Sequence, residues 1–225
     1  MKWSVVTTAI YTNRDRIHYL DDSCRKHGIE LTPFGIGGIY YGWVRTLMDV
    51  TLPGIESVDA THILCVDGID SLIVAPMDEI ISKYEALGSP SCLMSTERNM
   101  FPNCREAELF GDSVWRFPNG GNFMGDKQYI LDMWRRLYPK YPQESAYQGW
   151  IINEWPIEGL KLDTGCSVFQ TMDIAPEETG IHNGRLMNRV TLSQPCVLHF
   201  AGGYVDQKTG RDERMKPWVM KLNAV

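Results

Sequence analysis

The sequence predicts an α/β protein with a mainly parallel central sheet flanked by helices. Apolar segments of strand length alternate with segments in which apolar residues recur at helical spacing, which is typical of βαβ units. At 225 residues, with 44% hydrophobic and 22% charged residues, the chain has the size and composition of a globular domain. We therefore expect one domain over residues 1–225, without internal repeats or linkers.

The first half of the chain supplies three of the predicted strands. The predicted elements are, in order, a buried strand at 3–10, a helix within 14–28, a strand at 29–37, a helix at 43–50 and a strand at 61–67. A glycine-rich loop at 35–42 precedes the second helix. Because ligands of such a sheet bind at the carboxyl ends of its strands, Asp67 lies where a ligand is expected.

The second half is less regular. A helix is predicted at 76–87, where Pro76 precedes the acidic residues of a first turn and the apolar residues form one stripe. The remaining predictions are a strand at 92–96, a turn at residues 119–121, a helix at 128–142 broken by prolines, and a helix at 146–155.

Composition narrows the class of protein. The formal net charge of −6 gives no electrostatic support for a nucleic-acid or anionic-membrane partner. No segment approaches the roughly 20 apolar residues of a membrane span, and the N-terminal apolar run is strand-like, so we expect a cytoplasmic protein without a signal. The six cysteines are scattered without a C-x-x-C pair, which predicts buried thiols rather than a zinc site or a disulfide framework.

Two carboxylates follow the most apolar predicted strand. The run at residues 63–66 ends in Asp67, and Asp70 comes three positions later. A carboxylate at the end of a buried strand is costly unless something pairs with it. Either Asp67 caps a turn at Gly68 while Asp70 is solvated, or both hold a divalent cation that also contacts a diphosphate. The spacing alone leaves both interpretations open.

Several segments resemble, in the same order, those of a known enzyme family. They are "SVVTTA" (4–9), "CVDGIDSLIVA" (65–75), "NGGNFMG" (119–125), "KLDTGCSVFQ" (161–170) and "VLHFAGG" (197–203). Together they resemble the glycosyltransferase domain of procollagen lysyl hydroxylases and related collagen glycosyltransferases. The ending H-x-x-G followed by "KPW" (216–218) is similar to that of the glycogenin and bacterial lipooligosaccharide galactosyltransferase family. This resemblance implies a single GT-A domain, which is a Rossmann-like nucleotide-binding fold.

The resemblance also implies a donor site. Asp67, Asp70 and His199 would bind Mn²⁺ or Mg²⁺, which bridges the diphosphate of a nucleotide sugar that we expect to be UDP-linked. Residues 1–75 would form the nucleotide-binding half, and residues 76–225 the half that binds the donor sugar and the acceptor. The other nucleotide-binding candidates are Thr7, Thr8 and Tyr11 near the base, Arg45 near the phosphates or sugar, Gly202 of the H-x-x-G motif, and Lys216 at the diphosphate.

The donor sugar would lie over residues 119–122. Gly120 and Gly121 allow close approach of the backbone, while Asn119 and Asn122 offer hydrogen bonds to hydroxyls and are candidate catalytic residues. Gln148, the third catalytic candidate, resembles the glutamine of a D-Q pair that reaches the sugar in retaining members, although Tyr147 replaces the aspartate.

The sequence leaves open which basic residue near the C-terminus contacts the diphosphate and which role the tryptophans have. The spacing between His199 and Lys216 is longer than in the usual motif, so Arg211 or Arg214 could serve instead. Tryptophan side chains can stack on sugars, but more often they pack in the core or at the rim of a site. The four candidates are Trp43, Trp115, Trp150 and Trp155.

The function expected from these motifs is that of a metal-dependent glycosyltransferase, which transfers a sugar to a hydroxyl acceptor with retention of the anomeric configuration. A sugar-nucleotide nucleotidyltransferase is an alternative, but it would need a glycine-rich pyrophosphate loop that "TTAIYTNRDR" lacks. A second alternative is a non-catalytic protein that binds a nucleotide sugar or a glycan. The intact metal-binding residues argue against this alternative. The acceptor stays open among a glycan, a protein side chain, a small molecule and a modified nucleobase.

Overall fold

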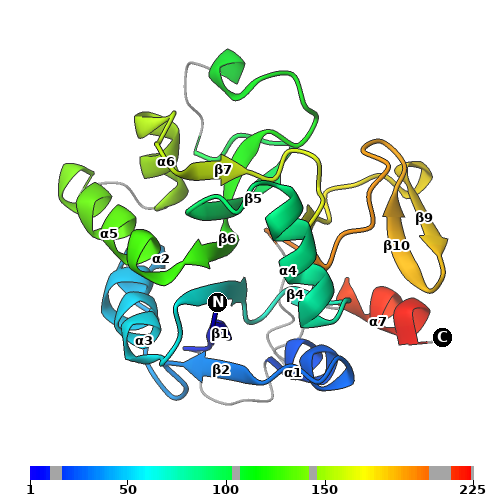
Figure 1. The fold of residues 1–225 in the computed structure, drawn as a ribbon, viewed down its shortest axis with the longest axis horizontal. Coiled ribbons are helices and arrows are strands. Elements are labelled where there is room, and N and C mark those ends of the chain that lie inside the picture. The colour runs from blue at the N-terminus through cyan, green and yellow to red at the C-terminus, as the bar shows by residue number, and fades with distance from the viewer. Residues whose placement is uncertain (11–16, 103–106, 142–145, 203–213, 224–225) are drawn as a thin grey trace.

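A computed structural model describes residues 1–10, 17–102, 107–141, 146–202 and 214–223. Its central sheet contains β1 (Trp3–Thr8), β2 (Leu31–Phe34), β3 (His62–Asp67), β5 (Cys92–Glu97), β6 (Phe117–Asp126) and β7 (Leu160–Leu162), in the order β2-β1-β3-β6-β5-β7 (Figure 1). Only β6 runs antiparallel to its neighbours in this sheet. The predicted α/β fold with a mainly parallel sheet is therefore confirmed.

Helices cover both faces of the central sheet. α1 (His18–Lys26) and α4 (Met77–Ala86) pack on one face, and α3 (Leu52–Ser57), α5 (Lys127–Leu137) and α6 (Gln148–Glu154) pack on the other (Figure 1). Successive residues of β3 point to opposite faces, as in any strand. Leu64 joins the core under α1 and α4, whereas Ile63 and Cys65 join the core under the other helices. The apolar run is thus continuous because both faces are buried.

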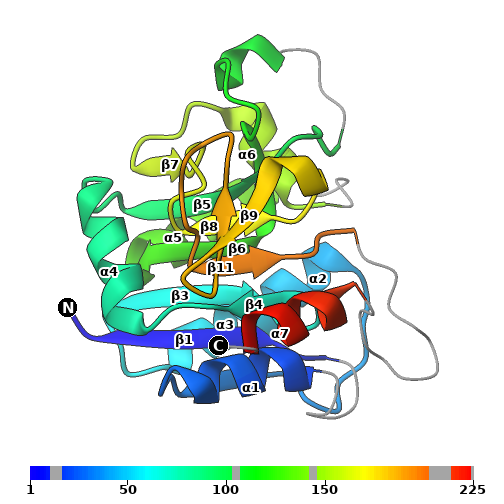
Figure 2. The same ribbon diagram turned by 90° about the vertical axis from the view of Figure 1, so that its right-hand side faces the viewer.

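A second sheet brings the end of the chain beside the middle. It contains β4 (Ser71–Ile73), β11 (Val197–His199) and β8 (Phe169–Thr171), and α7 (Met215–Asn223) packs against its apolar residues (Figure 2). A hairpin of β9 (Thr179–His182) and β10 (Arg185–Asn188) lies next to it. The hairpin was not predicted, although Asn183-Gly184, both with positive φ, is a strong hairpin signal.

The helix predicted at 43–50 is longer than expected and irregular. α2 (Trp43–Thr46) continues through a π-helical segment, Leu47–Thr51, into α3. Pro53 cannot donate a helical hydrogen bond to the preceding turn, which accounts for the widened segment. The π-helical turn brings the Thr51 hydroxyl to 2.7 Å from that of Thr8 at the end of β1. Short 3₁₀ helices lie at Ala107–Phe110, Tyr138–Lys140 and Pro176–Glu178.

The described cysteines, namely Cys24, Cys65, Cys92, Cys166 and Cys196, are buried free thiols, as predicted. None of the helices within the described ranges could span a lipid bilayer.

Candidate active site

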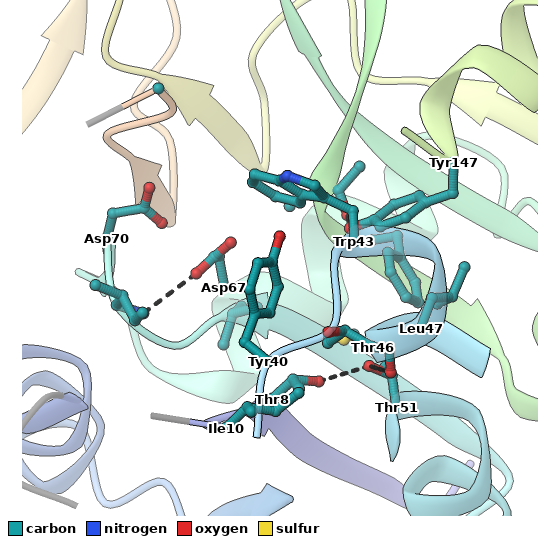
Figure 3. A pocket seen from close by; sticks show the side chains of 17 residues that line it. Thr8, Ile10, Tyr40, Trp43, Thr46, Leu47, Thr51, Asp67, Asp70 and Tyr147 are labelled. Carbon is teal, nitrogen blue, oxygen red and sulfur yellow. Dashed lines mark hydrogen bonds between the residues drawn. The ribbon is translucent and has the colours of Figure 1, made fainter. Parts of the chain in front are cut away.

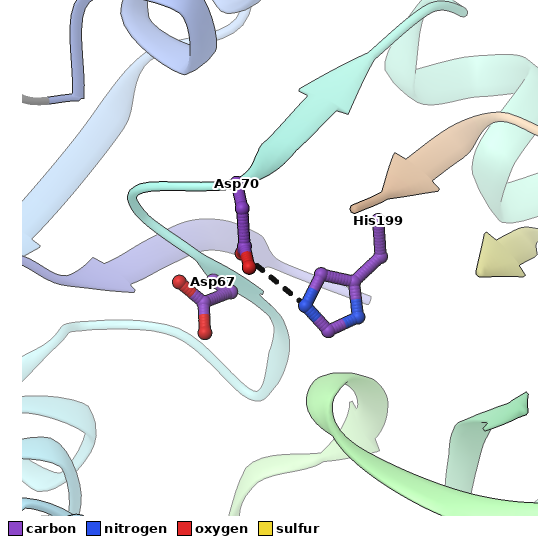
Figure 4. A group of neighbouring side chains, drawn as sticks. All are labelled: Asp67, Asp70 and His199. Atoms are coloured by element: carbon purple, nitrogen blue, oxygen red, sulfur yellow. Dashed lines mark ion pairs between the residues drawn. The ribbon is translucent and has the colours of Figure 1, made fainter. Parts of the chain in front are cut away.

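Asp67, Asp70 and His199 meet at the point where the two sheets join. Asp67 ends β3, Asp70 lies in the turn before β4, and His199 ends β11 (Figure 4). β11 pairs antiparallel with β4, which places His199 opposite Ser71, and the Phe200 N–H donates to the Asp70 carbonyl. One potential ligand atom from each of the three side chains lies within 4.8 Å of the others. Strand pairing therefore assembles the predicted cluster.

The electrostatic environment of this cluster favours a positively charged group, as the pKa values of its three residues indicate. Burial and the neighbouring Asp70 charge raise the pKa of Asp67 to about 7. Burial alone would raise the pKa of Asp70 and lower that of His199, but their attraction for each other reverses both directions. The pKa of Asp70 is therefore lowered, and that of His199 is raised.

The same three residues fit a divalent cation. Asp70 Oδ1 forms an ion pair with His199 Nε2 over 3.2 Å, and the other ring nitrogen, Nδ1, is buried without a hydrogen-bond partner among the described residues. Buried polar atoms normally have a partner. Two carboxylates and an imidazole are suitable ligands for Mn²⁺, and carboxylates that share a site with phosphate oxygens also suit Mg²⁺.

Residues 119–122 form a bulge inside β6, so the predicted turn at 119–121 is wrong. Met94 pairs with Phe123 and Thr96 pairs with Pro118, so these residues lie opposite Ser95 alone. The local Asn-Gly-Gly sequence favours a turn, but pairing with β5 on both sides of the bulge holds it within the strand.

The two glycines of this bulge contact aromatic rings. A Cβ on Gly120 would overlap the ring of Tyr147, and a Cβ on Gly121 would lie 2.7 Å from Nε2 of His199. Neither glycine has a positive φ, so close approach rather than backbone conformation requires glycine at both positions.

The asparagines of the bulge hold its shape and its neighbours. Asn122 is fully buried, and its Oδ1 accepts hydrogen bonds from the Asp67 N–H and the Ser71 hydroxyl. Its Nδ2 has no partner among the described residues. The Oδ1 of Asn119 accepts from the Gly121 N–H and the Ser95 hydroxyl. Asn122 thus connects the bulge to the Asp67 backbone.

A cavity of about 270 Å³ opens beside the cluster. Figure 3 shows Thr8, Ile10 and Thr51 at one end of it, Tyr147 at the other, and Asp67 between them. Its lining residues are Thr8, Ile10, Tyr40, Trp43, Thr46, Leu47, Thr51, Cys65, Val66, Asp67, Ile69, Asp70, Gly120, Gly121, Phe123, Tyr147 and Gly202. A cavity at the carboxyl ends of β1 and β3 is where an open α/β sheet binds its ligand.

Comparison with known proteins identifies the family. The model of the PLOD GT domain, the glycosyltransferase domain of the lysyl hydroxylase family, matches residues 2–208. The chain belongs to the PLOD GT domain family. No curated protein matches it. The glycosyltransferase assignment made from the ordered motifs is therefore confirmed.

Solved structures similar to this PLOD GT domain share its fold. One is a glycosyltransferase involved in the glycosylation of the major capsid of PBCV-1, with a TM-score of 0.57 and 10% identity over 100% of both chains. Another is the galactosyltransferase LgtC in complex with donor and acceptor sugar analogs, with a TM-score of 0.58 and 12% identity over 99% of this chain and 96% of that one. The GT-A fold is thus confirmed.

Six of the predicted site residues line the cavity of this PLOD GT domain: Thr8, Asp67, Asp70, Gly120, Gly121 and Gly202. Thr7 is buried beside it and donates to the Val66 carbonyl. Tyr11 and Arg211 lie outside the described residues.

The other described candidates do not line the cavity. Asn119, Asn122 and His199 are buried behind its lining, in the positions given above. Gln148 is buried at the start of α6, and Tyr147 occupies the cavity wall next to it. Arg45 is exposed and pairs with Asp49. Lys216 is exposed near the start of α7.

The sequence interpretation missed or underweighted several residues of this PLOD GT domain. Tyr40 lies in the loop after β2, Trp43 begins α2, and both line the cavity. Trp115 and Trp150 are fully buried, and Trp155 stacks on Phe110. Of the four tryptophans considered, Trp43 is thus the one at the site.

Glu97 was also missed. It ends β5, forms a hydrogen bond with Asn119, and has a pKa that burial raises to about 7. The signal was available, because an acid directly after a buried strand is the same signal that singled out Asp67.

Arg214 lies close to the cluster. Its guanidinium donates hydrogen bonds to the Phe200 and Ala201 carbonyls, and its charge contributes to the lowered pKa of Asp70, after the larger effects of burial and His199. It is thus near the metal candidates, as the alternative to Lys216 requires.

Proposed function

We propose that this glycosyltransferase is metal-dependent, takes its sugar from a UDP-sugar and transfers it to a hydroxyl acceptor with retention of the anomeric configuration. The observation that carries this proposal is the cluster of Asp67, Asp70 and His199, whose two carboxylates line the cavity. Family membership favours glycosyl transfer over the nucleotidyltransferase alternative. It gives no support to a purely binding role.

The cluster and Arg214 would act on the leaving group. Asp67, Asp70 and His199 would hold Mn²⁺ or Mg²⁺, and the bound cation would neutralise charge on the departing nucleoside diphosphate. Arg214, held by two backbone carbonyls near Asp70, would provide a second positive charge for the same oxygens. A preorganised cation stabilises charge that develops in the transition state without reorganisation during the reaction.

The two ends of the cavity suit the two ends of a nucleotide sugar. Thr8, Ile10, Tyr40 and Thr51 would surround the nucleoside, with hydroxyls for its polar edge and apolar or aromatic groups for its faces. Residues 120–121 would lie under the sugar, where the absence of side chains exposes the backbone. Asn122, whose Oδ1 accepts from the Asp67 N–H, would hold the end of β3 in place beside the donor.

Retention of the anomeric configuration is supported by the small number of cavity-lining groups that could act as a general base. An inverting transfer needs a group that accepts the proton of the attacking hydroxyl on the face opposite the leaving group. Among the described residues that line the cavity, the carboxylates are Asp67 and Asp70, which the proposal assigns to the metal. With both in use, attack from the side of the leaving diphosphate is the simpler route.

The test is a thermal-shift and turnover experiment. We expect UDP-sugars to raise the melting midpoint only with Mn²⁺ or Mg²⁺, because a ligand that binds the native state stabilises it by mass action. Asp70→Asn should abolish this shift. Asp59→Asn is the matched control, since Asp59 is 96% exposed and pairs with Lys2. A metal-independent shift in the wild-type protein, or an unchanged shift in Asp70→Asn, would refute the metal assignment.

Turnover then separates an enzyme from a binding protein. Release of UDP from each donor is measured with candidate acceptors from the four classes: glycans, hydroxyl-bearing peptides, small alcohols and hydroxymethylated nucleobases. The anomeric configuration of the product, determined by NMR, should match that of the donor sugar. An inverted product would refute retention while leaving the donor site in place.

A further inference from the structure

Tyr147 closes one end of the cavity as a fixed wall. Its ring packs so closely on Gly120 that a Cβ there would overlap it, and its hydroxyl donates a 2.9 Å hydrogen bond to the Gly120 carbonyl. The ring also meets the ring of Trp134 in α5 edge to face, with centroids 5.2 Å apart. These contacts hold the ring in one place, so the wall exists before a ligand binds.

This wall limits the room at the proposed sugar end. The cavity of about 270 Å³ is at or below the low end of typical ligand pockets, which are roughly 300–1,000 Å³. A nucleoside diphosphate and a sugar must both use it. The ring of Tyr147 fills volume next to Gly120 that a shorter side chain would leave open.

The wall is also uncharged. Burial raises the pKa of Tyr147 well above its usual value, so its phenol is neutral, and its hydrogen is donated to Gly120. Leu47 and Phe123 also line the cavity. A substituent of the sugar that points toward this wall therefore meets aromatic carbon rather than a charged hydrogen-bond partner, and an unpaired hydroxyl there is unfavourable.

We infer that the donor sugar is a pentopyranose and that Tyr147 selects it over the corresponding hexopyranose. The inference rests on the proposed function, because it places the sugar over Gly120 and Gly121. A hexopyranose carries a hydroxymethyl group on C5, where a pentopyranose carries only hydrogen. The C5 methylene of a pentose can pack on the ring of Tyr147, whereas the hydroxymethyl group of a hexose needs the space that the ring fills.

Matched donor pairs test this inference. UDP-xylose and UDP-glucose differ only in the hydroxymethyl group, as do UDP-arabinopyranose and UDP-galactose. Calorimetric titration in the presence of Mn²⁺ gives the ratio of the two dissociation constants within each pair. We expect the pentose member of at least one pair to bind tenfold or more tightly, since a single group in a close-fitting pocket changes selectivity by about 10- to 200-fold.

Two variants assign the preference to the ring. Tyr147→Phe keeps the ring and should keep the preference, whereas Tyr147→Leu leaves space beside Gly120 and should bring the ratio close to one. Because the ratio compares two ligands on the same protein, it is insensitive to a general loss of affinity, and circular dichroism checks that each variant is folded.

The outcomes separate this inference from the proposed function. If UDP itself fails to bind with Mn²⁺, the proposed donor site is wrong and the inference falls with it. If UDP binds but the wild-type protein binds the hexose member of both pairs as well as or better than the pentose, only the inference is overturned. A preference that persists in Tyr147→Leu would show that another residue selects the sugar.

Discussion

Gly121 and His199 are in direct contact across the junction of the two sheets. Gly121 lies in the bulge of β6, His199 ends β11, and a Cβ on Gly121 would lie 2.7 Å from the imidazole Nε2. Real Cβ atoms do not approach other atoms this closely. The glycine therefore allows His199 to reach Asp70, and the bulge and the metal candidates form one structural unit.

Gly121→Ala should consequently weaken metal binding. The added methyl group must displace the imidazole, and disturbing groups that orient a metal ligand typically lowers metal affinity about 10- to 100-fold. Titration with Mn²⁺ measures the change. Gly165→Ala is the matched control, because the nearest atom to a Cβ there is 3.5 Å away, and it should bind Mn²⁺ as the wild-type protein does. Equal affinities for the two variants would contradict the proposed coupling.

Arg214→Ala should mainly lower kcat. A cation that stabilises the departing diphosphate acts in the transition state, and loss of such a group costs about 100- to 1,000-fold in kcat. We expect a smaller change in KM for the donor, and partial recovery in Arg214→Lys. Arg135→Ala, which removes a surface partner of Glu56, serves as the control in the same assay. An unchanged kcat in Arg214→Ala would exclude Arg214 from the leaving-group site.

Asp163→Ala should destabilise the fold strongly. Asp163 is 1% exposed, and its carboxylate accepts hydrogen bonds from the N–H groups of Ser167, Val168 and Phe169 at 2.8–3.0 Å. Each buried donor left without a partner costs about 1–3 kcal/mol, so the free energy of unfolding should fall by at least about 3 kcal/mol. Urea denaturation measures it. Asp59→Ala should change it by less than about 0.5 kcal/mol, and a similar result for Asp163→Ala would show that the loop does not need the carboxylate.

Glu79 should contribute stability that is lost in acid. Burial alone would raise its pKa, but hydrogen bonds and ion pairs with Arg185 and Lys83 lower it to about 2. The folded pKa lies below the unfolded value of about 4.3, so the contribution is complete above that pH and disappears as the pH falls toward 2.

Comparison with Glu79→Gln isolates this effect from other carboxylates. Between pH 5 and pH 2, as the stabilisation is lost, the difference in the free energy of unfolding between wild type and variant should shrink by about 2 kcal/mol. Urea denaturation at several pH values in this range measures it. Parallel pH profiles for the two proteins would contradict the ion-pair account.

The sequence was most informative where local patterns and function coincide. The run that ends in Asp67 is buried on both faces of the sheet, so its apolar pattern predicted both the strand and the exceptional character of its terminal carboxylate. Asp70 was singled out by its spacing from Asp67 and assigned to the metal by the family motifs, whereas His199 followed from the motifs alone. Their meeting depends on β11 pairing with β4, a contact between distant segments that no local pattern encodes.

Predictions failed where distant contacts decide the local structure. The Asn-Gly-Gly segment has the composition of a turn but is held as a bulge because β5 pairs on both sides of it. Tyr147 was noted as a departure from the D-Q pair, but its position against Gly120 depends on α6 packing over β6. The sequence shows glycine at positions 120 and 121, but it does not show that the rings of Tyr147 and His199 pack against them.

The most direct test of the metal site is the anomalous diffraction of a crystal grown with Mn²⁺ and UDP. The account predicts one strong manganese peak within bonding distance of side-chain atoms of Asp67, Asp70 and His199, and of the UDP diphosphate oxygens. Asp70→Asn crystals should lose the peak. Clear density for UDP in the cavity with no manganese between these residues, or with manganese bound elsewhere, would contradict the account.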